Sequence, residues 1–260
     1  MDAKIFVPLI TPLNDRGQVC KASVASIISS VESFASGYIP CLTSGEGWLL
    51  SDTQWKAMVS ACVDFSNGRK VIAGIEKPLS KDVVSLAKLA ESLGADGVMI
   101  TTPFGKDVTQ QAMYEHFSDV HDAISIEIYI YNENSLSNNT VDKKTLVEVA
   151  KLPRVVGIKE SMNKDFDADL INSLKNEDIE VYQGWENRIV NDELSDGNIC
   201  SLSNLFPELC LNAANSENNE LAEKVEELCQ EYGIYEESWY EHIKSHLFEK
   251  KLISTKLVVS

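Results

Sequence analysis

The sequence contains few basic residues for its number of acidic ones. It has 23 Lys and Arg residues against 40 Asp and Glu residues, which gives a formal net charge of −17 over 260 residues. Such a charge repels the phosphates of nucleic acids and the headgroups of anionic membranes. We therefore expect no nucleic acid and no membrane as a partner, although a local site can still bind a small anion.

Patterns that would hold a metal or a nucleotide are also missing. The six cysteines form no C-x-x-C pair, so we expect reduced and mostly buried thiols. His242 and His246 have the i, i+4 spacing of a zinc pair but no third ligand beside them, which favours surface histidines. Neither G-x-G-x-x-G nor a P-loop follows the first apolar run. We expect neither a metal nor a cofactor.

Long hydrophobic runs are absent as well. No apolar run reaches the length of a membrane-spanning helix. The N-terminal run in "MDAKIFVPLITPL" is short and interrupted by proline, unlike a signal peptide. These features predict a cytoplasmic protein.

What the sequence does contain is an alternation of two patterns. Short β-branched runs alternate with polar-apolar stretches of helical spacing, such as "SKDVVSLAKLAESLGA", for which Ser80 is a candidate N-cap and Gly94 a candidate stop. The apolar runs are "KIFVPLI", "YIPCLTS", "KVIAGI", "DGVMITT", "SIEIYIYN", "VVGIKE", "IEVYQG" and "GNICSLS".

Eight such runs with helices between them predict an α/β fold, a (β/α)₈ TIM barrel, with an open doubly wound sheet as the alternative. After about Asn204 the pattern becomes helical and strongly charged. We predict a barrel over residues 1–214 and a short C-terminal helical extension over residues 215–260.

In such a barrel the site lies where strands end, and the sixth run carries a lysine next to its last residue. Strand alternation in "VVGIKES" places Val155, Gly157 and Lys159 on one face and Val156 and Ile158 on the other. If the Gly157 face points inward, Lys159 points into the barrel mouth. Burial there should lower the pKa of the amine and make it a nucleophile for a carbonyl. A strand-end lysine that reaches solvent is the other interpretation.

Two further strand ends carry groups that suit the same chemistry. Tyr131 closes the fifth run and could transfer protons beside the lysine, or could be an ordinary buried aromatic. The turn Thr43-Ser44-Gly45 follows the second run. Its hydroxyl and N–H groups could hold a carboxylate, or could serve only as turn and capping groups.

The order and spacing of these elements resemble the dihydrodipicolinate synthase and N-acetylneuraminate lyase family of class I aldolases. "TSGE" resembles the family's T-T-G-E motif, "YNENS" its Y-N-x-P-S motif, and "VVGIKES" its G-I-K-[ED]-[AST] motif. The other segments that carry the resemblance are "PLITPLND", "TPFGKDVTQQAMYEHF" and "DGNICSLSNLFP".

The resemblance implies a role for each matching residue. Lys159 would form a Schiff base with a 2-oxo acid such as pyruvate, and Tyr131 would transfer protons. Thr43 and Ser44, with the backbone around Gly45, would hold the carboxylate. The backbone carbonyl of Ile199 would face the site. The partners implied are a small-molecule 2-oxo acid and an aldehyde, and the assembly implied is a homo-oligomer, a dimer or a tetramer.

The sequence departs from the family pattern at several positions. Gly105, after Phe104, stands where a second tyrosine normally completes a proton relay with a neighbouring subunit. Asn134 replaces the proline of Y-N-x-P, and Leu136 replaces the synthase's arginine, which binds a carboxylate. The C-terminal helical region is expected to end before the family's closing helices, which puts the usual tetramer in question.

We predict a Schiff-base lyase or synthase that acts on pyruvate or another 2-oxo acid, and three alternatives stay open. One is 4-hydroxy-tetrahydrodipicolinate synthase itself, which joins pyruvate and aspartate semialdehyde, although Gly105 and Leu136 oppose it. Another is a non-catalytic barrel that binds a 2-oxo acid. A metal-dependent class II aldolase is opposed because no His/Asp/Glu cluster appears at the strand ends.

Overall fold

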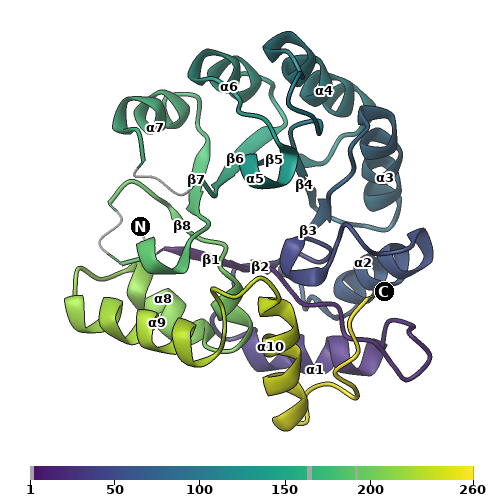
Figure 1. The fold of residues 1–260 in the computed structure, drawn as a ribbon. Coiled ribbons are helices and arrows are strands. Elements are labelled where there is room, and N and C mark those ends of the chain that lie inside the picture. The colour runs from purple at the N-terminus through teal and green to yellow at the C-terminus, as the bar shows by residue number, and fades with distance from the viewer. Residues whose placement is uncertain (1–2, 163–165, 191–192, 260) are drawn as a thin grey trace.

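Eight parallel strands close into a barrel that is ringed by helices, as Figure 1 shows. The computed structural model describes residues 3–162, 166–190 and 193–259. Each strand pairs with its neighbours in chain order, and β8 closes onto β1. The predicted (β/α)₈ barrel is therefore confirmed. The strands are β1 Lys4–Val7, β2 Gly37–Tyr38, β3 Lys70–Ile75, β4 Gly97–Thr101, β5 Glu127–Asn132, β6 Val155–Glu160, β7 Glu180–Gln183 and β8 Gly197–Asn198.

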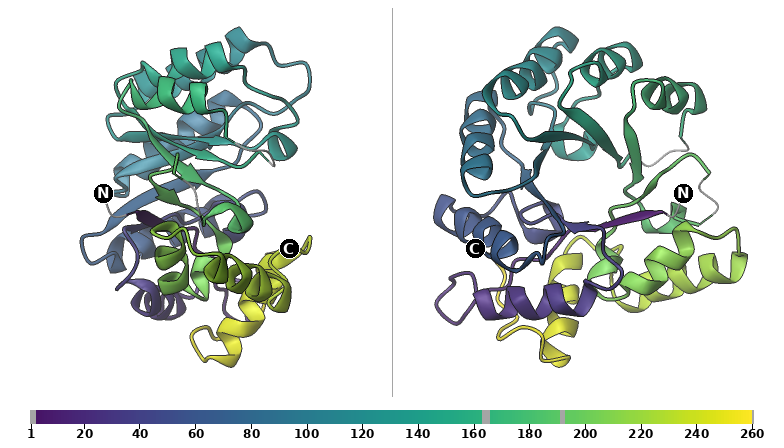
Figure 2. Two further views of the ribbon diagram at one scale, coloured as in Figure 1. Left: turned by 90° about the vertical axis from the view of Figure 1, so that its left-hand side faces the viewer. Right: turned by 180° about the vertical axis from the view of Figure 1, so that it is seen from behind.

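Helices follow the strands and cover the outside of the barrel (Figure 2). Among the residues that the structure describes, no helix is long and apolar enough to cross a membrane. The α-helices are α1 Lys21–Val31, α2 Asp52–Phe65, α3 Ser80–Ser92, α4 Gln110–Ala123, α5 Asn134–Ser137, α6 Lys143–Ala150, α7 Ala168–Lys175, α8 Pro207–Ala214, α9 Asn219–Glu231 and α10 Trp239–Glu249. The 3₁₀ helices are η1 Thr43–Gly45, η2 Glu186–Arg188 and η3 Ser201–Asn204.

The sequence predicted the end of helix α3 correctly but not its N-cap. Gly94 follows the helix with a φ of 88°, the left-handed conformation that ends many helices. Ser80 is wrong as an N-cap, because it is the first helical residue and Leu79 occupies the cap position. The Ser80 hydroxyl instead bonds to His116 Nδ1 of α4 at 2.8 Å, so a contact between helices replaces the cap.

Side chains from alternate strand positions form two separate cores. Residues such as Ile128, Ile130 and Ile158 pack outward against the helices. The barrel interior is filled by a second cluster, made of Phe6, Ile39, Leu42, Ile72, Met99, Tyr129, Tyr131, Tyr182 and Ile199.

A register shift at the start of the β5–β6 pairing corrects one detail of the predicted alternation. Val155 pairs with Ile128, but the next pair joins Gly157 to Tyr129. Val155 therefore packs in the outer core while Val156 packs against the interior cluster, the reverse of the prediction. Beyond the shift, Gly157 and Lys159 face inward as expected.

Gly157 makes room for the ring of Tyr129. A Cβ at Gly157 would lie 2.7 Å from a Tyr129 ring carbon. That ring is fully buried and packs near Phe6 and Tyr182, with centroid separations of 6.3 and 6.5 Å. These aromatic side chains fill the barrel interior beneath Lys159.

The C-terminal region packs on the segments that follow β1, β2 and β7. α9 contacts α8 and η2, and α10 contacts η1. The tail after α10 crosses to the loop before α1, where Thr255 Oγ1 donates to Leu13 O at 2.7 Å. Figure 1 shows α10 and this tail in yellow beside α1 and α2. The division at residue 214 stays a prediction, and its outer ends, residues 1 and 260, lie outside the described residues.

The packing around Gly157 predicts a measurable cost for adding one methyl group. Gly157→Ala should lower the free energy of unfolding by about 1–3 kcal/mol, because the buried Tyr129 ring has no space to move into. Chemical denaturation would measure the loss. In a Tyr129→Leu background the same change should cost clearly less. An equal cost in both backgrounds would contradict this account of the glycine.

Candidate active site

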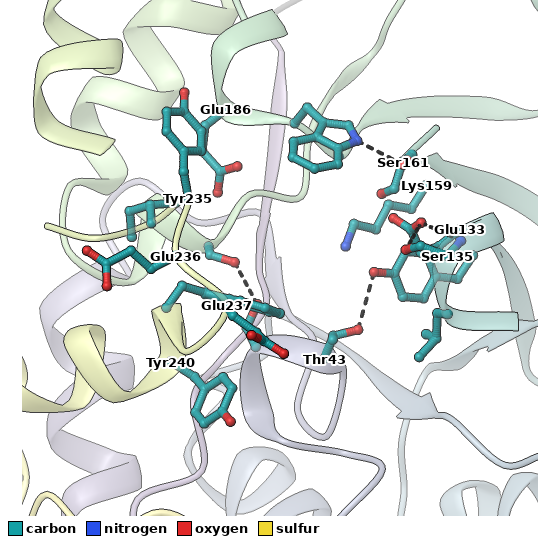
Figure 3. Close-up of a pocket in the computed structure, with 18 of the residues that line it drawn as sticks. Thr43, Glu133, Ser135, Lys159, Ser161, Glu186, Tyr235, Glu236, Glu237 and Tyr240 are labelled. Carbon is teal, nitrogen blue, oxygen red and sulfur yellow. Dashed lines mark hydrogen bonds between the residues drawn. The ribbon is translucent and has the colours of Figure 1, made fainter. Parts of the chain in front are cut away.

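A cavity of about 650 Å³ opens at the carboxyl ends of the strands. Figure 3 shows Lys159 and Thr43 pointing into it, with Glu186, Tyr235 and Tyr240 on the other side. Its wall includes four of the predicted site residues, which come from three separate strand ends. These are Thr43, Ser44, Tyr131 and Lys159.

The pairing of β5 with β6 brings the lysine and the tyrosine together. Tyr131 and Lys159 are direct register partners, one residue from the end of each strand. Lys159 is only 6% exposed, and its Nζ lies 4.1 Å from the centre of the Tyr131 ring. The interpretation of Lys159 as a solvent-reaching lysine is therefore wrong, because its amine ends inside the cavity.

The charge state of Lys159 differs from the expectation. Burial alone lowers the pKa of its amine, but the Tyr131 oxygen, with smaller effects of Cys200 and Glu133, stabilises the ammonium. The pKa of Lys159 is therefore raised above its ordinary value. Burial in turn raises the pKa of the Tyr131 hydroxyl, against the opposing effect of Lys159. The resting pair is an ammonium beside a neutral phenol, so the amine has to lose a proton before it can attack a carbonyl.

Thr43 connects Tyr131 to a carboxyl group that the sequence analysis did not select. The Thr43 and Tyr131 hydroxyl oxygens are 3.2 Å apart. Thr43 Oγ1 also donates a hydrogen bond to Glu76 Oε1. Glu76 directly follows β3 and is 3% exposed. A charged residue immediately after the apolar run "KVIAGI" was the signal that could have identified it.

Of the three other predicted site residues, Ser44 lines the cavity and Gly45 and Ile199 do not. The Ser44 hydroxyl bonds to the Ser201 hydroxyl of η3 at 2.8 Å, which brings two strand ends together. Gly45 lies behind the wall, where a Cβ would come within 2.6 Å of the Leu9 carbonyl oxygen. Ile199 is 1% exposed and belongs to the interior core. Neither Gly45 nor Ile199 lines the cavity.

The positions that depart from the family pattern also have definite places. Leu136 of α5 lines the cavity, so an apolar side chain stands where the family's arginine was expected. Gly105 adopts a φ of 131°, and its N–H donates to Ser137 O at 2.9 Å. That bond joins the loop after β4 to α5. Asn134 is exposed at the start of α5.

The outer part of the cavity is acidic and aromatic, which sequence reasoning missed. Lys159 is the only cation among the residues of the described chain that line it. Trp185 is held by a 2.8 Å hydrogen bond from its Nε1 to Ser161 O. Tyr235 and Tyr240 come from the C-terminal region, for which the sequence analysis predicted only a helical extension. The carboxylates are Glu133, Glu186, Glu236 and Glu237, and the large aromatics are Trp48, Trp185, Trp239, Tyr235 and Tyr240.

The last residue of "TSGE" ties the site to the C-terminal region. Glu46 is fully buried and forms an ion pair with Lys244 of α10, which is also fully buried. Its other oxygen accepts a hydrogen bond from Val259 N at 2.7 Å. Glu46 takes a left-handed φ of 57° directly after η1. α10 and the tail therefore fix the turn that carries Thr43 and Ser44.

A buried amine beside a tyrosine at the mouth of a (β/α)₈ barrel is the arrangement of a class I, Schiff-base-forming aldolase. In the described residues no group of three or more His, Cys, Asp or Glu could hold a metal ion. The model of the dihydrodipicolinate synthetase family matches residues 1–256. The chain therefore belongs to this family of carbon–carbon lyases.

Individual relatives agree with that assignment. The chain is 35% identical over 207 residues to a 4-hydroxy-tetrahydrodipicolinate synthase of Caldicellulosiruptor bescii. The aligned residues make up 78% of this chain and 70% of the relative. A 4-hydroxy-tetrahydrodipicolinate synthase of Anaplasma marginale is 29% identical to the chain over 211 residues. These residues make up 80% of this chain and 70% of the relative.

Solved structures agree on the fold. A dihydrodipicolinate synthase of Thermotoga maritima aligns with a TM-score of 0.85 at 25% identity and covers 100% of this chain and 94% of its own. A prophage protein of the dihydrodipicolinic acid synthase family from E. coli K12, solved with pyruvate, aligns with a TM-score of 0.87 at 18% identity and covers 99% of this chain and 91% of its own.

The buried Glu46–Lys244 pair predicts a large effect of removing one partner. Lys244→Met should lower the free energy of unfolding by about 3–5 kcal/mol, because it leaves a carboxyl group buried without its counter-ion. Denaturant titration would measure it. Adding Glu46→Gln to that variant should recover part of the loss. A Lys244→Met protein as stable as the parent would show that the pair does not hold the turn.

Proposed function

We propose that the protein is a Schiff-base lyase or synthase that forms an imine between Lys159 and pyruvate or another small 2-oxo acid. The observation that carries the proposal is the Lys159 amine, buried 4.1 Å from the centre of the Tyr131 ring inside a cavity. Family membership supports it, and a structural neighbour of the same family was solved with pyruvate.

The residues around the amine divide the chemistry between them. The Ser44 hydroxyl and the backbone N–H groups of Thr43 and Ser44 would hold the carboxylate of the oxo acid, as the family resemblance implies, while the Thr43 hydroxyl donates its proton to Glu76. Lys159, once deprotonated, attacks the oxo carbon, and loss of water gives an iminium. Tyr131 exchanges protons with the reacting nitrogen and oxygen. The iminium withdraws electrons, so the neighbouring carbon can lose a proton and form a carbon–carbon bond with an aldehyde, or the reverse.

We propose further that the aldehyde carries hydroxyl or amino groups rather than a second carboxylate. Four carboxyl side chains line the cavity, and its lining cation, Lys159, is used by the imine. Leu136 offers a carboxylate no charge and no hydrogen bond. Hydrogen-bond donors on the aldehyde would suit the glutamates, and the aromatic side chains offer flat apolar contact.

Synthesis of 4-hydroxy-tetrahydrodipicolinate is the second candidate, because the relatives described above carry that name at up to 35% identity. It requires the carboxylate of aspartate semialdehyde to bind without an arginine at position 136. A non-catalytic barrel would need neither the buried amine nor its tyrosine. The homo-oligomer, dimer or tetramer, and the cytoplasmic location implied by the sequence stay predictions.

Imine formation can be tested without knowing the aldehyde. An imine acidifies the pyruvate methyl group, so the parent protein should speed the exchange of these protons with D₂O, followed by ¹H NMR. Lys159→Ala should reduce the exchange to the uncatalysed background while the circular dichroism spectrum is unchanged. Lys151→Ala, which removes an exposed lysine directly after α6, is the matched control. Exchange that survives in Lys159→Ala would rule out the Schiff base.

The cavity's discrimination against carboxylates gives a separate prediction. Leu136→Arg should raise kcat/KM for aspartate semialdehyde about tenfold, because a charge-assisted hydrogen bond contributes about 1.5 kcal/mol. Steady-state kinetics with pyruvate would measure it. Leu136→Met is the control for changed shape without charge. The explanation fails if the arginine leaves kcat/KM unchanged or if methionine gives the same gain.

A further inference from the structure

Glu76 is a buried carboxyl group positioned behind the cavity wall. It directly follows β3, is 3% exposed, and does not line the cavity itself. Its Oε1 accepts the hydrogen bond from Thr43 Oγ1. Its Oε2 is buried and has no hydrogen-bond partner in the described chain. A buried carboxyl group with one free oxygen is costly to maintain, which points to a role beyond packing.

The hydrogen bonds run in one direction from Tyr131 to Glu76. A threonine hydroxyl has a single proton, and Thr43 donates it to Glu76. The 3.2 Å contact between Thr43 and Tyr131 must then use the tyrosine as donor. The phenol oxygen of Tyr131 is left to accept a proton from the neighbouring Lys159. Lys159 Nζ lies 4.1 Å from the centre of the Tyr131 ring, so the four groups follow one another from the amine to the carboxyl group.

We propose that Glu76 is the terminal proton acceptor and donor for imine formation at Lys159, and that it acts through Thr43 and Tyr131 within a single chain. This inference rests on the function proposed above. Glu76 touches neither Lys159 nor the substrate pocket, so it is a positioning and proton-storing residue. Gly105 has no side chain to contribute a hydroxyl to the same path.

The proton balance of the step closes without any other reactant. The Lys159 ammonium gives a proton to the Tyr131 oxygen while the Tyr131 proton moves to Thr43 and the Thr43 proton to Glu76. The free amine then attacks the oxo carbon, and a proton passes from the new nitrogen centre to the oxygen. Glu76 returns its proton along the same path to the carbinolamine hydroxyl, which leaves as water. The products are the iminium, one water and the original Glu76 carboxylate.

The surroundings of Glu76 set the pH at which the path works. The groups that face it are Thr43, Tyr131 on β5, Lys159 on β6 and Cys41 after β2, while Lys77 follows it in the chain. Burial raises the pKa of Glu76 to about 7, against the opposing effects of the Thr43 hydrogen bond and Lys159. Only the ionised carboxylate accepts a proton, so imine formation should become faster as the pH rises through about 7.

The test is the rate of imine formation against pH, measured by rapid mixing with pyruvate, quenching with borohydride and intact mass. In the parent protein the rate should rise through neutral pH. Glu76→Gln keeps an acceptor for Thr43 but cannot take a proton. It should slow imine formation at least tenfold at pH 7.5 and remove the rise near neutrality. The adduct should still reach full occupancy at long times.

Controls separate this relay from a structural role and from the proposed function itself. Glu127→Gln makes the same change of charge at the start of β5 and should keep the parent pH profile. A purely structural Glu76 would lower thermal stability, yet leave the neutral rise in place, and that result would overturn the relay. If the parent forms no adduct with pyruvate or with other 2-oxo acids, the proposed function fails and the relay fails with it.

Discussion

The contact between Lys159 and Tyr131 is the interaction on which the site depends. Hydrogen bonding of β5 to β6 sets these residues opposite each other, one position before each strand ends. The register shift after Ile128 produces this arrangement, because it brings Gly157 opposite Tyr129 and Lys159 opposite Tyr131. A slip of one residue would turn the amine toward the outer helices. The glycine and the tyrosine below the site therefore fix its geometry as much as the reacting groups do.

Burying an amine has a chemical consequence as well as an energetic one. Desolvation disfavours the ammonium, but the oxygen of Tyr131 and nearby acidic groups stabilise it more. The cavity thus stores a proton on Lys159 that has to be moved before reaction. The hydroxyl groups of Tyr131 and Thr43 lead to the Glu76 carboxyl group, which is the path that we propose for this proton. Beyond this inner region the cavity wall is acidic and aromatic, and our proposal for the aldehyde rests on that lining.

Much of this architecture could be predicted from local patterns. The alternation of strands and helices gives the barrel, and strand ends place Lys159, Tyr131 and Thr43 near one mouth. Contacts between distant segments could not be read in this way. Glu76 accepts a hydrogen bond from Thr43, which lies 33 positions earlier in the chain. Glu46 forms an ion pair with Lys244 of α10. The inside-outside order of Val155 and Val156 depended on a register shift that no local alternation reveals. The pKa of Lys159 depended on its partners, not on burial alone.

The most direct test of the account is borohydride reduction of the protein in the presence of pyruvate, followed by intact mass and peptide mapping. The account predicts one adduct of the mass of reduced pyruvate per chain, located on Lys159. An adduct on another lysine, or none with pyruvate and a panel of other 2-oxo acids, would contradict it.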